Sequence, residues 1–201
     1  VGVTLQDTHE VLLFRISDLV SSDGTVQNYT SDDCTVVTLP NRSTGAEPWP
    51  DGINVVQDTL GAEYFVVAGE YNDTLIFLDL EGQIVNSHEI QPSDMPGDLP
   101  RNLESWNNAP FRPDSLASFQ YDGRSYLAAS LKHAGAIGVW LVDDPTSIQV
   151  AHVVKIGFDD QGNSTTESTI GTEGISATND GLIITANEKE SSVSMVGPLL
   201  D

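Results

Sequence analysis

The sequence predicts an all-β fold built from similar antiparallel sheets that follow one another along the chain. One phrase occurs four times: an apolar run, a polar anchor, four loop residues and a second apolar run. The anchors, which lie 56 to 64 residues apart, are Gln6, Glu70, Lys132 and Glu188. The apolar runs are short, turn residues separate them, and helical periodicity is almost absent. A hairpin repeated at this period is typical of a β-propeller, whose blades are four-stranded antiparallel sheets.

The first unit is expected at residues 1–39. Its chain opens on Val1-Gly2-Val3, which reads as the middle of a strand, so we expect further chain before it. The segment 17–33 is rich in Ser, Asp and Asn and reads as a polar insert. The expected strands are Val1–Leu5, Val11–Ile16 and Thr35–Leu39.

The second and third units, at residues 53–90 and 114–156, each show four strands. Glu81-Gly82 and Asp122-Gly123 provide tight turns between strands. The expected strands of the second unit are Ile53–Val56, Glu63–Ala68, Leu75–Asp79 and Ile84–Ile90. Those of the third are Ser115–Gln120, Ser125–Ser130, Ile137–Val142 and Ile148–Ile156.

The fourth unit, at residues 174–201, lacks its outermost strand. Its expected strands are Ile175–Thr178, Leu182–Ala186 and Val193–Val196. The chain thus holds about three and a half units, and propellers close with typically 4–8 blades. Residues 1–201 are therefore predicted to be a partial β-propeller that further chain, or another chain, completes. A β-sandwich is the alternative, but it would not explain the repeated hairpin.

Composition limits the classes of partner. Thirty acidic and 8 basic residues give a net charge of −22. Such a surface repels nucleic acid and attracts cations and basic partners. Either a salty or calcium-containing medium screens this charge, or the acids serve only solubility. No run of 18 apolar residues occurs, so the chain is not expected to span a membrane.

Four N-glycosylation motifs favour an extracellular protein. They fall in predicted loops, where a glycan can be accommodated, at Asn28, Asn41, Asn72 and Asn163. In a propeller the last three would share one face and Asn28 would lie on the other. Cys34 is the only cysteine, so it is a buried apolar residue, a free thiol, or half of a bridge to a missing segment.

Three segments resemble blades of the choice-of-anchor I domain, a family of secreted or surface-attached propellers related to YVTN-type repeats. These are Leu60–Gly69 with Leu75–Asp79, Asp122–Ala128 with Gly138–Pro145, and Gly171–Ile175 with Ala186–Glu188 and Ser192–Met195. The resemblance covers about residues 53–196. It implies a propeller of about seven blades, of which this chain is the C-terminal portion. It implies no catalytic set, although some members carry phosphatase or phytase-like labels. Pro113-Asp114-Ser115 departs from the family's Pro-Glu-Gly.

Carboxylates form the candidate metal site. Asp114 and Glu173 hold equivalent positions in their units, and Glu188 is an anchor. If they converge at the propeller mouth, they would bind a hard cation such as Ca²⁺. The alternative is that Glu173 caps a strand entry and Glu188 ends a strand in solvent. The four histidines lack metal-ligand spacing, and no nucleophile elbow or phosphate loop occurs.

Two tryptophans, Trp49 and Trp106, lie in the long connectors. They either form an exposed binding surface for sugars or proteins or fold back against the blades.

We therefore expect an extracellular, non-enzymatic propeller glycoprotein: a binding or assembly module of a cell surface, matrix or extracellular filament. Its partners would be other extracellular proteins or glycans, and an open sheet edge would allow assembly by strand pairing. The alternative function is a calcium-dependent hydrolase, phosphatase-, phytase- or lactonase-like, that uses the mouth carboxylates. A third hypothesis is an acidic protein of a halophile in which the glycosylation motifs are accidental.

Overall fold

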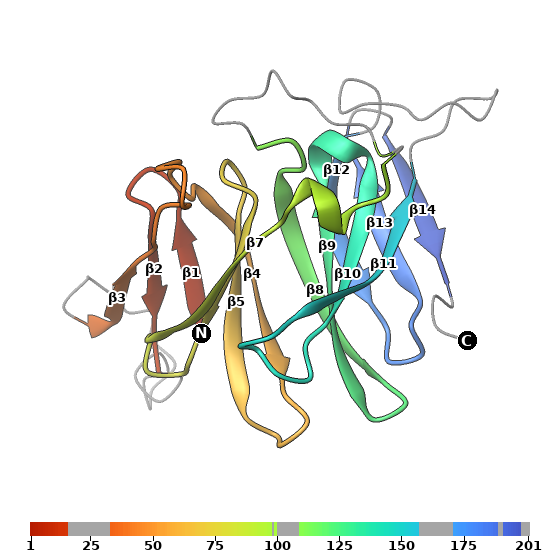
Figure 1. Cartoon of the computed structure of the whole chain (residues 1–201). Helices are drawn as coiled ribbons and strands as arrows, with labels where there is room; N and C mark the ends of the chain where they lie inside the picture. Colours follow the sequence, from red (N-terminus) through yellow and green to blue (C-terminus); the bar gives the residue numbers. More distant parts are fainter. Residues whose placement is uncertain (16–32, 98, 100–108, 157–170, 189–190, 198–201) are drawn as a thin grey trace, which may run out of the picture.

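The computed structural model describes residues 1–15, 33–97, 99, 109–156, 171–188 and 191–197. These residues form β-strands and two short 3₁₀ helices, and no α-helix occurs among them. The strands make four antiparallel sheets that follow one another along the chain (Figure 1). The predicted all-β fold of consecutive antiparallel sheets is confirmed. Within the described ranges, no helix is long and apolar enough to cross a membrane.

The first two sheets contain three and four strands. The first sheet consists of β1 (Gly2–Leu5), β2 (Glu10–Leu13) and β3 (Thr35–Thr38). The second consists of β4 (Pro50–Gln57), β5 (Glu63–Gly69), β6 (Thr74–Leu78) and β7 (Ile84–Glu89). In both sheets, strands that are neighbours in sequence are neighbours in space.

The last two sheets repeat this order with four and three strands. The third consists of β8 (Pro113–Tyr121), β9 (Arg124–Leu131), β10 (Ala136–Leu141) and β11 (Gln149–Lys155). The fourth consists of β12 (Thr172–Ala177), β13 (Ile183–Asn187) and β14 (Ser192–Val196). The 3₁₀ helices are η2 (Pro92–Asp94) and η4 (Lys132–Ala134).

Apolar side chains on both faces of the second and third sheets hold the stack together. On β5, Phe65 and Val67 pack in a cluster with the first sheet, whereas Val66 and Ala68 pack in a cluster with the third. A third cluster, which includes Val139 of β10 and Ile183 of β13, joins the third sheet to the fourth. This alternation explains why the sequence of β5 is an almost unbroken apolar run. Two face-to-face sheets, the sandwich alternative, would not give three successive clusters.

The hairpin loops after the anchors share one backbone geometry. The third residue after each anchor has a left-handed backbone, with φ between 51° and 57°, at His9, Asp73, Gly135 and Ser191. The carbonyls of the first three accept a hydrogen bond from the end of the outer strand of their own sheet, at 2.8 to 3.0 Å. The next strand begins at the following residue in every case. The four loops are therefore structurally equivalent, as the sequence repeat predicts.

This equivalence fixes the place of β1. The loops in question follow β1, β5, β9 and β13. In the last three sheets, these are second strands, because β4, β8 and β12 pair with them on the other side. The strand β1 therefore corresponds to a second strand, and the described part of the first sheet contains no counterpart of β4.

Candidate functional site

The inner strands β4, β8 and β12 all begin with the same irregularity. Pairing with the neighbouring strand shifts register within their first four residues. A bulge of this kind re-aims the side chain that it contains. The second residue of each strand is acidic: Asp51, Asp114 and Glu173. We call the end of the molecule that holds these acids and the four anchors the mouth; it lies toward the top of Figure 1.

Close backbone approach brings two of these acids together. A Cβ atom built on Gly52 would lie only 2.3 Å from the carbonyl oxygen of Asp114. A residue with a side chain would therefore push β4 away from β8 at this point. The glycine thus allows the adjacent Asp51 to approach Asp114.

Three carboxylates meet in the mouth. Asp51, Glu70 and Asp114 each present one oxygen, and these three oxygens all lie within 4.8 Å of one another. The side chains belong to two sheets, because Asp51 and Glu70 flank the second sheet and Asp114 starts the third. Glu70 and Asp114 are only 4% and 6% exposed. We call this group the carboxylate cluster.

Two cationic side chains border the cluster. The guanidinium of Arg112 pairs with Glu70, lies 4.2 Å from the ring centre of Tyr71, and is 2.9 Å from Nε2 of His133. The ammonium of Lys132 pairs with Glu173 and lies 3.6 Å from Oδ2 of Asp114. Both cations are thus engaged with particular acids.

The balance of burial and charge sets the protonation of the cluster. Burial raises the pKa of Glu70 and of Asp114 to about 6, despite the nearby cations. Burial also raises the pKa of Asp51. Burial alone would raise the pKa of Glu173 too, but the hydrogen bond and charge of Lys132 hold it below its usual range. At neutral pH the cluster therefore holds carboxylate anions that repel one another. A bound cation would offset this repulsion.

A buried aspartate, Asp73, binds the backbone of Arg112. Asp73 is fully buried and accepts hydrogen bonds from the backbone N–H groups of Phe111, at 3.2 Å, and Arg112, at 2.7 Å. The guanidinium of Arg42 lies 3.9 Å away. Burial raises the pKa of Asp73 to about 7. This aspartate ties the β5–β6 loop to the chain that enters β8.

The structure places the three predicted metal ligands differently. Asp114 belongs to the carboxylate cluster, whereas Glu173 is paired with Lys132 and Glu188 lies exposed at the end of β13. Sequence reasoning did not select Asp51 or Glu70. Both carried a signal: Pro50-Asp51-Gly52 matches Pro113-Asp114-Ser115, and Glu70 is itself an anchor.

The predicted aromatic and glycosylation positions have mixed outcomes. Trp49 is half-buried, with ring centres 5.5 Å from His9 and 5.3 Å from Tyr71, so it packs back over the mouth. Asn41 is exposed in the loop between β3 and β4. Three further predicted positions, Trp106, Asn28 and Asn163, lie outside the described residues.

Asn72 corrects the prediction that all four motifs lie where a glycan fits. Its side chain is fully buried, accepts a 2.6 Å hydrogen bond from Thr74 and donates one to the carbonyl of Ala46. The loop position was predicted, but the amide points inward, where Thr74 and Ala46 hold it. A glycan on the Asn72 amide nitrogen has no room in this fold.

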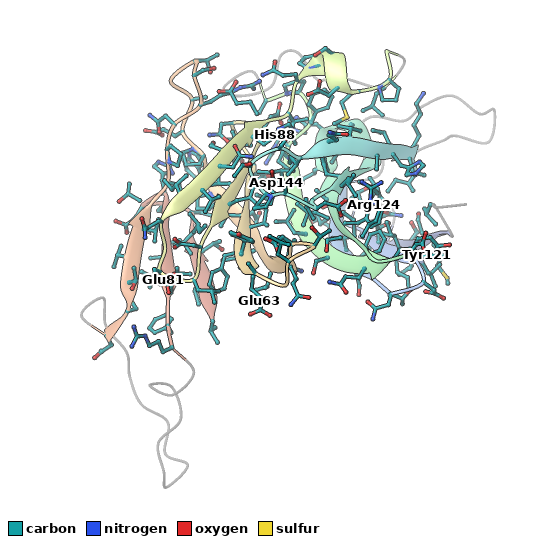
Figure 2. All side chains as sticks on the ribbon, turned by 60° about the horizontal axis from the view of Figure 1, so that its bottom comes forward. Glu63, Glu81, His88, Tyr121, Arg124 and Asp144 are labelled. Atoms are coloured by element: carbon teal, nitrogen blue, oxygen red, sulfur yellow. The ribbon has the colours of Figure 1, made fainter. Side chains whose placement is uncertain are left out.

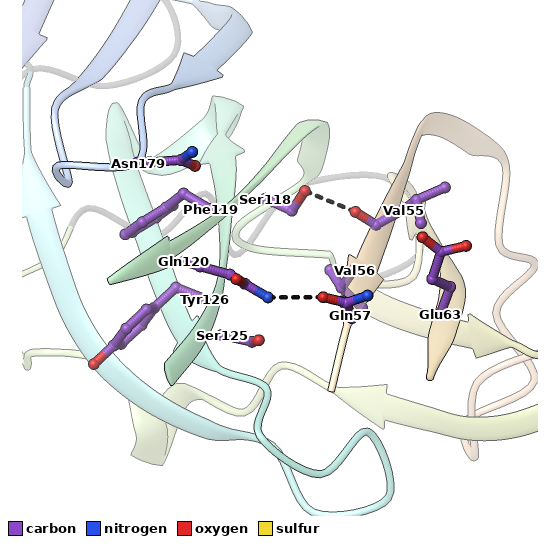
Figure 3. A pocket seen from close by; sticks show the side chains of 10 residues that line it. All are labelled: Val55, Val56, Gln57, Glu63, Ser118, Phe119, Gln120, Ser125, Tyr126 and Asn179. Atoms are coloured by element: carbon purple, nitrogen blue, oxygen red, sulfur yellow. Dashed lines mark hydrogen bonds between the residues drawn. The ribbon is translucent and has the colours of Figure 1, made fainter. Parts of the chain in front are cut away.

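At the opposite end of the inner strands lies a hollow of about 240 Å³ (Figure 3). Its amide and hydroxyl groups bond mainly to each other: Gln120 donates to Gln57 at 3.1 Å, and Ser118 donates to the carbonyl of Val55 at 2.7 Å. Glu63 lies at its edge. Figure 2 shows that Glu63, Glu81 and Tyr121 lie at this end of the molecule. Among the described residues that line this hollow, Glu63 is the one acid, so no cluster like that of the mouth forms there.

Comparison with known proteins bears on the fold. No protein-family model matches the chain, and no curated protein matches it. An inactive variant of virginiamycin B lyase from Staphylococcus aureus, solved with quinupristin, covers 100% of this chain at 16% identity and a TM-score of 0.53. A protein from Lactobacillus plantarum covers 98% at 14% identity and a TM-score of 0.55. The fold is that of a β-propeller.

The similarity extends no further than the fold, because the identities are low. The chain spans 52% of each of these two solved structures. Within them, its four sheets would account for about half of a complete propeller. What either protein binds or converts is not transferred to this chain by that likeness.

Proposed function

We propose that this chain is part of an extracellular β-propeller glycoprotein that serves as a non-enzymatic binding or assembly module, and that its mouth binds a hard cation such as Ca²⁺. One observation carries the cation assignment. Three carboxylate oxygens from two successive sheets lie within 4.8 Å of one another, and two of the three side chains are buried. Oxygens at that separation are close enough to share one bound cation.

The chemistry of the cluster favours calcium over softer metals. All three side chains offer only oxygen, which hard cations prefer, whereas zinc sites usually include sulfur or nitrogen ligands. Calcium takes 6–8 oxygens at 2.3–2.6 Å, so water would complete the shell. Lys132 lies 3.6 Å from Asp114 and opposes a second positive charge there. Its pairing with Glu173 draws it away, and we expect modest affinity as a result.

An extracellular location is consistent with the surface. The net charge of −22 suits a medium with abundant cations, and Asn41 presents an exposed glycosylation motif. Membership of the choice-of-anchor I family is part of this proposal. The propeller fold is compatible with it, and the resemblance rests on the blade motifs in the sequence.

Calcium titration calorimetry tests the cation site. We expect saturable binding to the whole chain, weakened at least about tenfold by Asp114→Asn, since a tenfold change corresponds to about 1.4 kcal/mol. The control is Asp122→Asn, the same change at the far end of the same sheet. Protons compete for Glu70 and Asp114, whose pKa values are about 6. Affinity should therefore fall as the pH drops from about 7 to about 5.

Equal calcium affinity in Asp114→Asn and Asp122→Asn would contradict the site. So would calcium binding that disappears in moderate sodium chloride, because that would indicate only general attraction to an acidic surface.

A calcium-dependent hydrolase is the second candidate. The observation in its favour is that Glu70 and Asp114 have pKa values of about 6, which would let either accept a proton near neutral pH. Hydrolysis of a simple phosphoester or lactone that is abolished by chelator and by Glu70→Gln would support it. With no such turnover in the wild-type chain, the binding role stands alone.

A further inference from the structure

The hollow at the end of the molecule opposite the mouth is polar but nearly uncharged. It lies between the second, third and fourth sheets, and its lining residues run from Val55 to Asn179, so neither end of the chain contributes to it. Among the described residues that line it, Glu63 is the one charged group. We call it the amide hollow; its neutral polar lining residues are Gln57, Ser118, Gln120, Ser125 and Asn179.

One buried hydroxyl in the amide hollow has no partner. Ser125 is the second residue of β9 and is only 4% exposed. Its backbone N–H donates to Asp143 at 3.1 Å, whereas its hydroxyl makes no hydrogen bond within the described part of the chain. Figure 3 shows the Ser125 oxygen on the side that faces Gln57. Since buried polar groups are generally hydrogen-bonded, the partner of this hydroxyl must come from a molecule that enters the hollow.

Two glutamine side chains in the hollow are held in place but keep hydrogen-bonding capacity. Gln120 donates to Gln57 at 3.1 Å, and Gln57 donates to the carbonyl of Gly61 at 3.2 Å. An amide nitrogen carries two hydrogens, so each glutamine keeps a second N–H donor. The glutamine pair therefore presents further donors in fixed positions beside the Ser125 hydroxyl.

Charge and hydrogen-bonding chemistry indicate the class of ligand. Glu63 lies exposed at the edge of the hollow, and the chain has a net charge of −22, so a phosphate or carboxylate would be repelled. One acid is too few to hold a divalent cation, which takes several oxygen ligands. Amide and hydroxyl side chains match a ligand hydroxyl, because it both donates and accepts. The favoured ligand is therefore neutral and rich in hydroxyl groups.

The size of the hollow limits that ligand to about one sugar ring. Its volume of about 240 Å³ lies below the roughly 300–1,000 Å³ of sites for drug-sized molecules. Val55, which is 39% exposed, provides an apolar side for the C–H groups of such a ring. Gln57 and Gln120 are exposed, so the hollow opens to solvent and a longer glycan could extend from it.

We propose that the amide hollow binds one neutral sugar unit, free or at the end of a glycan, with the Ser125 hydroxyl and the amides of Gln57 and Gln120 as its hydrogen-bonding partners. The inference gives the proposed binding module a class of ligand and in that respect rests on the proposed function. It does not depend on a cation, because the carboxylate cluster lies at the other end of the inner strands.

Sugar titration followed by saturation-transfer NMR tests the site on the whole chain, in the presence of chelator. The probes are glucose, galactose and mannose, each as the free sugar and as the terminal unit of a neutral oligosaccharide. We expect saturable binding of at least one sugar and weaker binding of the matching uronic acid, whose carboxylate Glu63 repels. Tighter binding of the oligosaccharide indicates a glycan end as the ligand, whereas equal binding indicates the free sugar.

Ser125→Ala isolates the unpartnered hydroxyl. Sugar affinity should fall roughly five- to tenfold, the loss expected for one hydrogen bond. The melting temperature should not fall, because the hydroxyl bonds to nothing in the fold; a merely structural serine would show the reverse. The matched control is Ser87→Ala, at an exposed serine on β7, which should bind sugar like wild type.

Gln120→Ala provides a second variant on a different strand. Gln120 is exposed on β8, so the substitution should cost little stability, yet it removes an amide of the hollow and frees Gln57. We expect a loss of sugar affinity at least as large as that of Ser125→Ala.

Three results would overturn the inference: no binding of any of the three sugars in either form, equal binding of the uronic acids, or unchanged affinity in both Ser125→Ala and Gln120→Ala. Because the sugar assay contains chelator, its failure is separate from failure of the cation site. Sugar binding that is lost while calcium still binds refutes only the amide hollow, and calcium binding that is lost while sugar still binds refutes only the mouth.

Discussion

Single residues in this protein are constrained mainly by the loops that carry the anchors. The third loop residue must adopt φ near +50°, which costs an ordinary L-residue about 1–2 kcal/mol. Gly135 meets this demand without a side chain, whereas Asp73 meets it with one of the residue types that tolerate the conformation. Asp73 also accepts hydrogen bonds from the backbone N–H groups of Phe111 and Arg112. One residue therefore shapes its own loop and holds the segment that enters β8.

Substitution of Asp73 separates these two roles. Asp73→Ala should destabilise the fold by about 2–5 kcal/mol, because alanine disfavours the left-handed backbone and leaves the N–H groups of Phe111 and Arg112 without an acceptor. Asp73→Asn keeps the conformation and one acceptor oxygen, so its cost should be clearly smaller. Chemical unfolding of both variants gives the two free energies of unfolding, and equal values would contradict the assignment.

The raised pKa of Asp73 makes the stability difference between wild type and Asp73→Asn depend on pH. The folded pKa of Asp73 is about 7 against an ordinary value of 3.8, so the folded state holds the proton more tightly than the unfolded state. Wild-type stability from this group is therefore highest at low pH and declines as the pH rises from about 4 to about 7. Asparagine does not titrate. The difference in unfolding free energy between wild type and Asp73→Asn should therefore narrow from about pH 4 to about pH 7 and stay level above that. A difference that is constant over this range would count against a titrating Asp73.

The strands are the elements that sequence reasoning predicts best. Alternation, turn residues and the anchor repeat placed a predicted strand at each strand of the structure. The main differences are that β12 begins at Thr172 rather than Ile175 and that β4 begins at Pro50 rather than Ile53. That difference matters for the site. A proline followed by aspartate and glycine reads as a connector, yet Pro50 pairs with Gly69 across the bulge and carries Asp51 into the mouth.

The contacts across sheets could not be predicted in the same way. Lys132 pairs with Glu173, and Asp73 binds the backbone of Phe111, over 41 and 38 residues of chain. The repeat places these residues at one end of the molecule, but it does not say which acid meets which base. That choice depends on bulge geometry and on side-chain length, as the engagement of Glu173 by Lys132 shows.

The packing of β4 against β8 gives a prediction at the scale of the element. Gly52→Ala would put a Cβ atom 2.3 Å from the Asp114 carbonyl oxygen and 2.9 Å from the Cα atom of Ser115, so the two strands must separate. We expect a loss of thermal stability and weaker calcium binding, because Asp51 and Asp114 move apart. The control is Gly97→Ala, since a Cβ at Gly97 meets no atom within 4 Å.

In titration calorimetry and thermal melting, Gly97→Ala should behave like wild type. If Gly52→Ala also leaves both the calcium affinity and the melting temperature unchanged, close approach of β4 and β8 does not control the mouth.

At the scale of the whole molecule, charge is the dominant feature. Thirty acids on 201 residues repel one another in a compact propeller, and only a few of them are paired with a base inside the mouth. Two distinct effects of cations are therefore expected. Any salt screens the general repulsion, whereas a cation bound by the carboxylate cluster relieves a local one.

Thermal melting distinguishes the two effects. Sodium chloride raised from about 10 mM to about 500 mM shortens the screening length from about 30 Å to a few ångström, so the melting temperature should rise in every variant. Low-millimolar calcium changes ionic strength little, yet should add a further rise in wild type and in Asp122→Asn. Asp114→Asn should keep the sodium chloride response and lose the calcium increment. If Asp114→Asn retains that increment, the stabilising calcium ion binds elsewhere on the acidic surface, and the mouth is not its site.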